Sequence, residues 1–380
     1  MTAIDPKTYA QLASRTYDRK DIRNKMTLPQ DFTELGWQDD DPLTGFSAGV
    51  YQNGNQIVIS FTGTNEKQLK DFVVANIPSG AGFGSAQITR AAELVLETMR
   101  QHPDAEISFT GHSLGGGLAS VMAVLFDKKA VVFDPAPFQA SALNPVTLAM
   151  LYLYLTHNGY ENEALRRYVL PTEKPPLIPN VNNLSGYFAE NIVKIGQLFQ
   201  QREQNVSSWH VRGEVLQLTR DYAVEIGTVA ALLSKGMLGI NFGAIIGEGQ
   251  AHELDVGKDL IQGFGVGSTS EERYLRAVRQ AVEQESTLRE MYGDKQEGLW
   301  AKASTAFNKA VDLHSIVLLQ GLMDSEHFRQ SLQAMPDALD ILFDRQMYAL
   351  ESTETEEGAD FFARLIKQQI GGVDKRPSDT

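Results

Sequence analysis

A β-rich run, a glycine-rich turn and an apolar helix follow one another within residues 105–126. The turn reads GHSLG over residues 111–115, which is the pattern G-x-S-x-G. In this context the pattern is typical of a nucleophile elbow, where a serine stands on a sharp turn between a strand and a helix. Small residues two before and two after Ser113 would let the strand and the helix approach closely. This feature predicts a layered α/β fold with Ser113 as a nucleophile.

The segments around the elbow continue the same alternation. Residues 45–52 and 56–62 are β-rich, and the Asn53-Gly54 pair between them is a hairpin signal. Residues 87–101 place their apolar side chains on one face of a helix, and residues 130–133 form a further buried strand. Strand, helix, strand, helix, strand within about 80 residues is the pattern of parallel α/β units.

The composition excludes several classes of protein. The chain of 380 residues has 34 Lys plus Arg against 48 Asp plus Glu, a net charge of −14. So acidic a chain is a poor candidate for nucleic acid or for bulk attraction to anionic lipid. It has no Cys, which removes disulfides, thiolate zinc sites and Cys nucleophiles. We expect neither a metal nor a cofactor.

Membrane and export signals are weak in the sequence. The start, MTAIDPKTYAQL, lacks the basic and apolar regions of a secretory signal peptide. The most apolar stretch, residues 226–247, contains Lys235 and is interpreted as two packed helices, with a membrane-entering hairpin as the alternative. The expected location is therefore outside the cell by a non-classical bacterial route, or the cytoplasm before export.

An elbow serine needs hydrogen-bond donors for the oxyanion that forms during acyl transfer. One donor is expected to be the backbone N–H of Leu114, the residue after the nucleophile. The other should come from the loop that follows residues 56–62, where Thr64 can offer both its N–H and its hydroxyl.

Two motifs carry a family resemblance. IVISFTGTN at residues 57–65, together with GHSLGGGLA at residues 111–119, resembles the class 3 lipases, the fungal-lipase-like branch of the α/β-hydrolases. The resemblance implies that Ser113 is the nucleophile and Thr64 the oxyanion residue. It covers roughly residues 45–140, whereas the region after residue 260 looks more like bacterial secreted phospholipases and lipase-like toxins. Asp71 resembles a family aspartate, but the tryptophan of that motif is absent, and Asp71 is given no role.

The resemblance and the patterns together predict the architecture. We expect an α/β-hydrolase core with a mostly parallel sheet, a helical insertion and a largely helical C-terminal part. Residues 1–136 would be the N-terminal part of the core. Residues 137–205 would be a helical insertion that could act as a cap or lid. Residues 206–330 would complete the core with the acid and the histidine, and residues 331–380 would be a helical, acidic tail.

The acid of the triad is predicted to be Glu214. In the family the order is Ser, then Asp or Glu, then His. Residues 209–218 are strand-like in character, and the strand at residues 209–211 leads into Arg212-Gly213-Glu214-Val215. These four residues resemble the family's Gly-Asp-x-Val segment with Glu in place of Asp. Asp221 and Asp255 are rivals, and Asp134 ends the preceding strand. A surface Glu214 paired with Arg212 is the alternative.

The base is predicted to be His314, with His252 as the alternative. His314 lies at a loop-to-helix boundary followed by apolar residues, where the family's catalytic histidine often lies. His252 lies in a polar, glycine-flanked segment, and His327 is interpreted as a solvent-side helix residue. His112 is the variable residue within the elbow itself.

These features predict a serine esterase that hydrolyses carboxylic esters of lipids through an acyl-enzyme on Ser113. The resemblance favours a phospholipase A1. The alternatives are a triacylglycerol lipase, a lipid acyltransferase or a non-catalytic membrane-active protein on a lipase scaffold. The expected partners are a lipid ester, a transient membrane surface and an inhibitory or accessory protein, and no nucleic acid.

Overall fold

The computed structural model describes residues 3–17, 28–38, 41, 44–63, 85–170, 179–212, 214, 216, 249–254 and 314–324. The chain divides into two compact units. The larger unit comprises Gln30–Trp209 and Thr219–His252, and the smaller one Met1–Pro29, His210–Leu218 and Glu253–Thr380. Several residues and segments singled out above lie outside the described residues: Thr64, Asp71, Asp221, Asp255, His327, the apolar stretch 226–247 and the tail 331–380.

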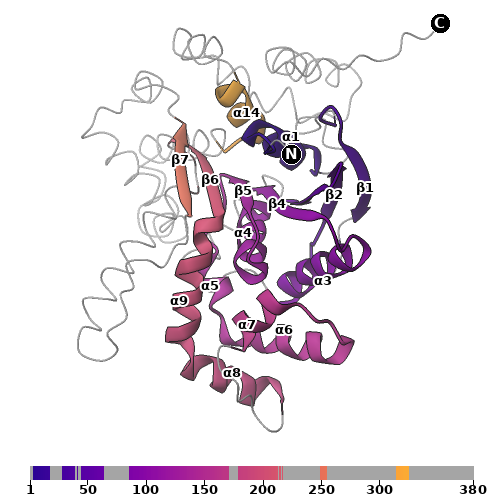
Figure 1. Cartoon of the computed structure of the whole chain (residues 1–380). Helices are drawn as coiled ribbons and strands as arrows, with labels where there is room; N and C mark the ends of the chain where they lie inside the picture. Colours follow the sequence, from indigo (N-terminus) through magenta and orange to yellow (C-terminus); the bar gives the residue numbers. More distant parts are fainter. Residues whose placement is uncertain are drawn as a thin grey trace, which may run out of the picture. The chain divides into compact units, whose positions relative to one another are not determined.

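A seven-stranded sheet follows the order of the sequence (Figure 1). Its strands are β1 Thr33–Gln38, β2 Ala48–Asn53, β3 Gln56–Phe61, β4 Glu106–His112, β5 Ala130–Phe133, β6 Val206–Val211 and β7 Gln250–Leu254. The first three strands pair antiparallel, and β3 through β6 pair parallel. The predicted α/β fold with a mostly parallel sheet is confirmed.

The register of the parallel strands brings their carboxyl ends to one edge of the sheet. Phe61 at the end of β3 pairs with Gly111, His112 at the end of β4 pairs with Phe133, and Phe133 pairs with Trp209. All four residues of β5 and the last five of β3 are buried, as expected for parallel strands covered on both faces. The elbow therefore follows β4 at the edge where ligands usually bind in such sheets.

The predicted hairpin joins β2 to β3. Asn53 pairs with Gln56, so the two loop residues are Gly54 and Asn55, one position later than the sequence signal suggested. Gly54 has a φ of 57°, a conformation that glycine adopts without the strain that a Cβ would bring.

Seven α-helices of the larger unit lie within its described residues. They are α3 Ser85–Gln101, α4 Leu114–Phe126, α5 Gln139–Ala142, α6 Pro145–Asn158, α7 Glu163–Val169, α8 Val181–Glu190 and α9 Ile192–Arg202. Helix α4 packs against β3, β4 and β5, whereas α6 and α8 pack on each other farther from the strands (Figure 1). The described part of residues 137–205 is thus helical, as predicted, apart from the short 3-10 turn Glu203–Asn205 that leads into β6.

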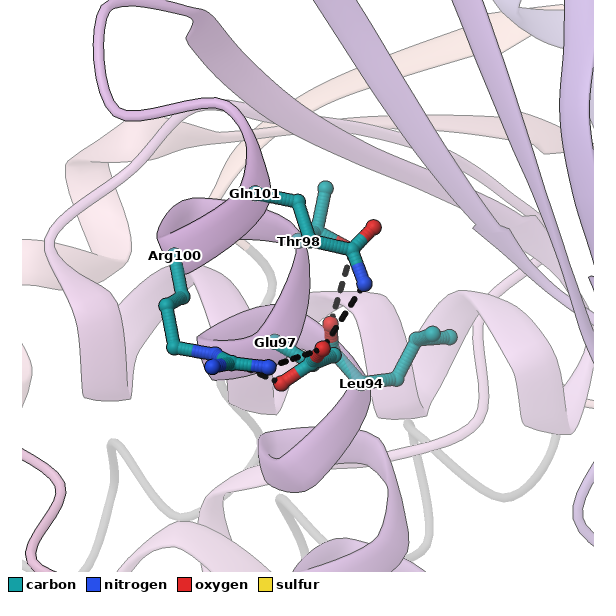
Figure 2. Close-up of polar contacts among 5 residues, drawn as sticks. All are labelled: Leu94, Glu97, Thr98, Arg100 and Gln101. Carbon is teal, nitrogen blue, oxygen red and sulfur yellow. Dashed lines mark hydrogen bonds and ion pairs between the residues drawn. The ribbon is translucent and has the colours of Figure 1, made fainter.

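The exposed side of α3 is held by local polar contacts. Glu97 accepts hydrogen bonds from Arg100 at 2.7 and 3.0 Å and from Gln101 at 2.7 Å (Figure 2). These bonds, first from Arg100 and then from Gln101, lower the pKa of the Glu97 carboxyl. Pairs three or four residues apart lie on the same side of a helix and stabilise it slightly. This face is a solvated surface, and its opposite side buries Ile88, Ala91 and Val95.

The smaller unit contains α1 Pro6–Arg15 and α14 Ile316–Asp324, which pack together. Helix α1 begins after Asp5, whose carboxylate accepts the N–H of Lys7 at 3.1 Å, and Pro6 occupies the first helical turn. The buried Gln320 of α14 donates to the carbonyl oxygen of Ala10 at 2.9 Å. The beginning of the chain therefore supports the segment that follows His314.

Two predictions about strands need correction. Residues 209–218 were predicted to be strand-like, but β6 begins at Val206 and ends at Val211. Arg212 then lies in a turn, and Glu214 donates its N–H to Val211 at 3.2 Å, which turns the chain away from the sheet. The segment around His252 was interpreted as a polar loop and is the strand β7. Its residues 250–253 are exposed, so no apolar alternation marks it in the sequence.

A buried arginine fastens the helical insertion to α4. Arg202 of α9 is 5% exposed and donates hydrogen bonds of 3.0 Å to the carbonyl oxygens of Val124, Leu125 and Ala164. Two of these carbonyl groups belong to the last turn of α4, where carbonyl groups have no hydrogen-bond partner within the helix. The guanidinium also lies 5.5 Å from the ring centroid of Tyr168, and burial lowers the pKa of Arg202.

We therefore predict that Arg202→Met lowers the free energy of unfolding by about 2 kcal/mol or more, because three carbonyl groups lose their buried donor. Urea unfolding followed by circular dichroism measures the change. Arg100→Met is the matched control: its partner Glu97 lies on the surface, and we expect a change within about 0.5 kcal/mol. Equal effects of the two substitutions would contradict this role for Arg202.

Candidate active site

Ser113 stands on the strand-to-helix turn in a strained conformation. Its φ is 60° and its ψ is −128°, and α4 begins at the next residue. A positive φ is rare for a residue with a Cβ and persists only where the surrounding structure enforces it. Here the Ser113 N–H donates to Phe133 at 3.0 Å, and its carbonyl accepts from Gly117 at 3.1 Å and Ala136 at 3.0 Å. The predicted elbow is present.

The glycines around Ser113 are required by close packing of backbones. A Cβ on Gly115 would lie 2.1 Å from the carbonyl oxygen of Phe61, and one on Gly111 would lie 2.4 Å from the carbonyl carbon of Gly115. Real Cβ contacts essentially never fall below 3.0 Å. The first turn of α4 therefore rests directly on the ends of β3 and β4, which only glycine permits.

The hydroxyl of Ser113 is enclosed. The residue is 1% exposed, and among the described residues of its own unit none forms a hydrogen bond with Oγ. A buried hydroxyl is normally hydrogen-bonded, and the exceptions are often functional. Among the described residues of its unit, the Ser113 hydroxyl is therefore not held by a structural hydrogen bond.

The predicted oxyanion donors are only partly described. Leu114 is the first residue of α4, so its N–H belongs to the helix end that carries positive partial charge. Thr64 lies outside the described residues, but the two residues before it are described. Thr62 donates its N–H to Ser47 at 3.1 Å, and the preceding Phe61 touches the elbow at Gly115. The chain thus leaves β3 at Thr62, directly after the residue that lies against the elbow.

A second pair of titratable side chains flanks the nucleophile. His112 and Asp134 are 4% and 0% exposed, and His112 Nε2 lies 3.9 Å from Asp134 Oδ2. Asp134 has a φ of 40° and donates its N–H to Trp209 at 2.7 Å, which fixes the end of β5. Sequence reasoning placed Asp134 at the end of the strand before the acid and His112 within the elbow, but did not predict their pairing across two adjacent strand ends.

Glu214 and His314 meet in the smaller unit. His314 Nδ1 lies 2.7 Å from Glu214 Oε2, across a sequence separation of 100 residues. Glu214 is fully buried and His314 is 6% exposed. The same carboxylate oxygen accepts the N–H of Leu216 at 2.6 Å, so it is held in place from its own segment. A carboxylate on Nδ1 fixes the tautomer of an imidazole and stabilises its protonated form.

The start of α14 fixes the backbone of His314. The helix begins two residues later, at Ile316. Ser315 caps it: its hydroxyl accepts the N–H of Leu318 at 3.3 Å, and its carbonyl accepts the N–H of Leu319 at 2.9 Å. His314 therefore lies at the loop-to-helix boundary that the sequence predicted. Nδ1 is the ring nitrogen that faces Glu214.

The other candidates for the base and the acid lie in different surroundings. His252 is exposed and stacks on Trp209 with ring centroids 4.5 Å apart. Arg212 lies 3.8 Å from Glu253, and the interpretation of Glu214 as a surface residue is wrong because it is completely buried. Asp221 and Asp255, the other candidate acids, lie outside the described residues.

The larger unit thus presents a serine on a strand-to-helix turn, and the smaller unit contains a buried His–Glu pair. Residues 8–174 match a protein-family model described as phospholipase-like, Tle-like phospholipase domain. Residues 8–174 are therefore similar to a Tle-like phospholipase domain, and the predicted resemblance to bacterial phospholipase A1-type proteins is confirmed.

Individual relatives agree with this placement. The extracellular phospholipase A1 of Serratia liquefaciens is 35% identical over 104 residues, which cover 27% of this chain and 31% of the relative. The chain therefore matches about a third of the length of that curated relative.

Similar solved structures include two fungal lipases. The lipase from Rhizopus microsporus var. chinensis is 14% identical with a TM-score of 0.31, and covers 56% of this chain and 66% of its own. Lipase II from Rhizopus niveus is 14% identical with a TM-score of 0.30, and the match covers 56% of this chain and 72% of that lipase.

The close approach of Gly115 to Phe61 generates a prediction. Gly115→Ala should destabilise the protein by about 3 kcal/mol or more, because the new methyl group clashes with backbone that cannot move away. Thermal unfolding measures the effect. Gly196→Ala on α9 is the control: its Cβ would meet nothing within 4 Å, and replacing a helical glycine should stabilise by up to about 1 kcal/mol. A Gly115→Ala protein as stable as wild type would contradict the described elbow.

Proposed function

We propose that this chain is a serine esterase that hydrolyses the carboxylic esters of phospholipids, with Ser113 as the nucleophile. The observation that carries the proposal is the positive φ of Ser113 on the turn between β4 and α4. Strain of this kind raises the serine above the sheet edge and directs the first amides of the helix toward a bound carbonyl group. It has no evident structural benefit, since glycine would adopt the same conformation without strain.

His314 is proposed as the general base and Glu214 as the acid that orients it. The short hydrogen bond between them and the complete burial of Glu214 support these roles. A carboxylate fully removed from water needs a hydrogen-bonded partner, which His314 and the Leu216 N–H supply. The exposed His252 has a stacking partner in Trp209, and this makes it the weaker candidate.

The reaction would proceed by two acyl transfers. Ser113 Oγ attacks the ester carbonyl carbon while its proton passes to His314 Nε2. The resulting oxyanion accepts hydrogen bonds from the N–H groups of Leu114 and Thr64. When the intermediate collapses, the carbon–oxygen bond of the ester breaks, and the departing alcohol takes the proton from His314. The products of this half-reaction are the acyl-enzyme and a lysophospholipid.

Water completes the cycle. His314 takes a proton from a water molecule as its oxygen attacks the acyl-enzyme, and then returns the proton to Ser113 Oγ as the free fatty acid leaves. Throughout, the Glu214 carboxylate stabilises the positive charge that appears on the imidazole ring.

Phospholipid is the proposed substrate class, and the sn-1 ester the proposed position of attack. The phospholipase-like description of residues 8–174 supports the first, and the name of the Serratia relative supports both. That relative is also called extracellular, which supports action outside the producing cell. Because such an enzyme would damage its producer, we further propose a partner protein that blocks the site before export. None of the helices in the described residues is long and apolar enough to cross a membrane.

We predict that Ser113→Ala lowers phospholipid hydrolysis by on the order of 10⁴-fold or more, because the acyl-enzyme cannot form. The measurement uses phosphatidylcholine with distinguishable acyl chains at sn-1 and sn-2. Wild type should release the sn-1 fatty acid, and a fluorophosphonate probe should label wild type but not Ser113→Ala.

Ser120→Ala is a suitable control, because Ser120 lies in the helix that follows Ser113 and its hydroxyl donates to the carbonyl of Gly116 at 2.8 Å. It should keep wild-type labelling. Release of the sn-2 fatty acid would contradict the proposed sn-1 specificity but not the proposed esterase activity. If the Ser113→Ala protein is labelled, or keeps a tenth or more of wild-type hydrolysis, Ser113 is not the nucleophile.

A further inference from the structure

Helix α6 presents an apolar face to solvent. Val146 is 47% exposed and Met150 is 39% exposed, and they lie four residues apart on one side of the helix. Leu153 is half-buried and continues the same side three residues later. We call Val146, Met150 and Leu153 the docking face. Two of the four exposed large hydrophobic residues in the described part of the chain lie on it.

The opposite side of α6 already forms the core of the insertion. Leu148 and Leu151 are fully buried and Leu155 is 8% exposed, and the helix packs against α3, α7 and α8. An ordinary surface helix carries charged residues on the side away from its core. The docking face is apolar instead, so the packing of the insertion does not account for it.

The segment that contains the docking face carries no formal charge of its own. Residues 135–160 contain no Asp, Glu, Lys or Arg, in a chain of which 22% is charged and whose net charge is −14. A surface that enters the boundary of a bilayer must shed water, and ionised side chains oppose this strongly. Helix α6 itself therefore brings no formal charge to a lipid surface that approaches the docking face.

Two tyrosines lie on α6 and a third follows the helix. Tyr152, Tyr154 and Tyr160 are half-buried, and the rings of Tyr154 and Tyr160 stack with centroids 5.9 Å apart. Tyrosine favours the interface between lipid and water, because its ring is apolar and its hydroxyl is polar. Burial, and after it a hydrogen bond to Glu93, raise the pKa of Tyr154, so its phenol stays neutral.

We propose that the docking face lies against the surface of a phospholipid bilayer with zwitterionic headgroups. The inference rests on the proposed function, since a phospholipase must reach lipid that is aggregated in membranes. We specify zwitterionic headgroups because the helix is neutral and the chain is acidic. Neither would be attracted electrostatically to anionic headgroups. Insertion of the three apolar side chains would supply the affinity.

The test measures binding separately from catalysis. The Ser113→Ala protein is mixed with phosphatidylcholine vesicles, and the bound fraction is determined by flotation. Adding Val146→Glu and Met150→Glu should weaken binding about tenfold or more, because each new carboxylate must be desolvated. Val193→Glu on α9 is the matched control: Val193 is 57% exposed outside the docking face, and binding should be unchanged.

A labelling experiment covers the case in which the double variant folds poorly. The chain has no Cys, so Met150→Cys and Val193→Cys each give one site for an environment-sensitive fluorophore. The emission of the probe at residue 150 should shift to shorter wavelength on adding phosphatidylcholine vesicles, and that of the probe at residue 193 should not.

Catalytic assays separate this inference from the proposed function. In the active protein, the two Glu substitutions should lower the ratio of vesicle hydrolysis to hydrolysis of a short monomeric ester about tenfold. Failure of wild type to hydrolyse either ester would overturn the proposed function but not the vesicle-binding result. The docking face is overturned if vesicles do not bind, if binding requires added phosphatidylglycerol, if the double variant binds equally well, or if the face binds another protein copy instead.

Discussion

The contact between the first turn of α4 and the ends of β3 and β4 is the constraint on which the proposed chemistry depends. Gly115 can lie against the Phe61 carbonyl only because it lacks a Cβ, and Ser113, two residues earlier, has a φ of 60°. The N–H of Ser113 is in turn held by Phe133. Three adjacent strand ends therefore fix one serine and the amino end of one helix, and a developing oxyanion would meet donors already in place.

The proposed catalytic groups are distributed between the two compact units. Ser113 belongs to the larger unit, and the buried Glu214–His314 pair belongs to the smaller one, supported by α14 and α1. Each half is internally organised by its own hydrogen bonds. On this proposal, activity requires both halves, so changes at α1 would act on the histidine although α1 is distant from it in sequence. The docking face on α6 belongs to the same unit as Ser113.

Sequence reasoning predicted local features well. The elbow, the β2–β3 hairpin and strands β3 to β5 depend on short-range patterns such as apolar runs, glycine spacing and Asn-Gly turns, and these are visible in the residues themselves. The strand β7 was missed because residues 250–253 are exposed and lack apolar alternation. The pairing of His112 with Asp134 was missed because it depends on the register of two strands. The contact of Glu214 with His314 was inferred only from the order of residues in a family, since no local pattern joins positions 100 residues apart.

The central claim is that His314, oriented by Glu214, activates Ser113. The rate of phosphonylation of Ser113 by a fluorophosphonate measures this step without any lipid. We expect His314→Ala to lower that rate by about 10²-fold or more and Glu214→Gln to lower it less, while His252→Ala reacts like wild type. In Ser113→Ala, addition of His314→Ala should cause no further loss of lipid hydrolysis, because members of a triad act as one unit. A His314→Ala protein that reacts at the wild-type rate, with an unreactive His252→Ala, would contradict the account.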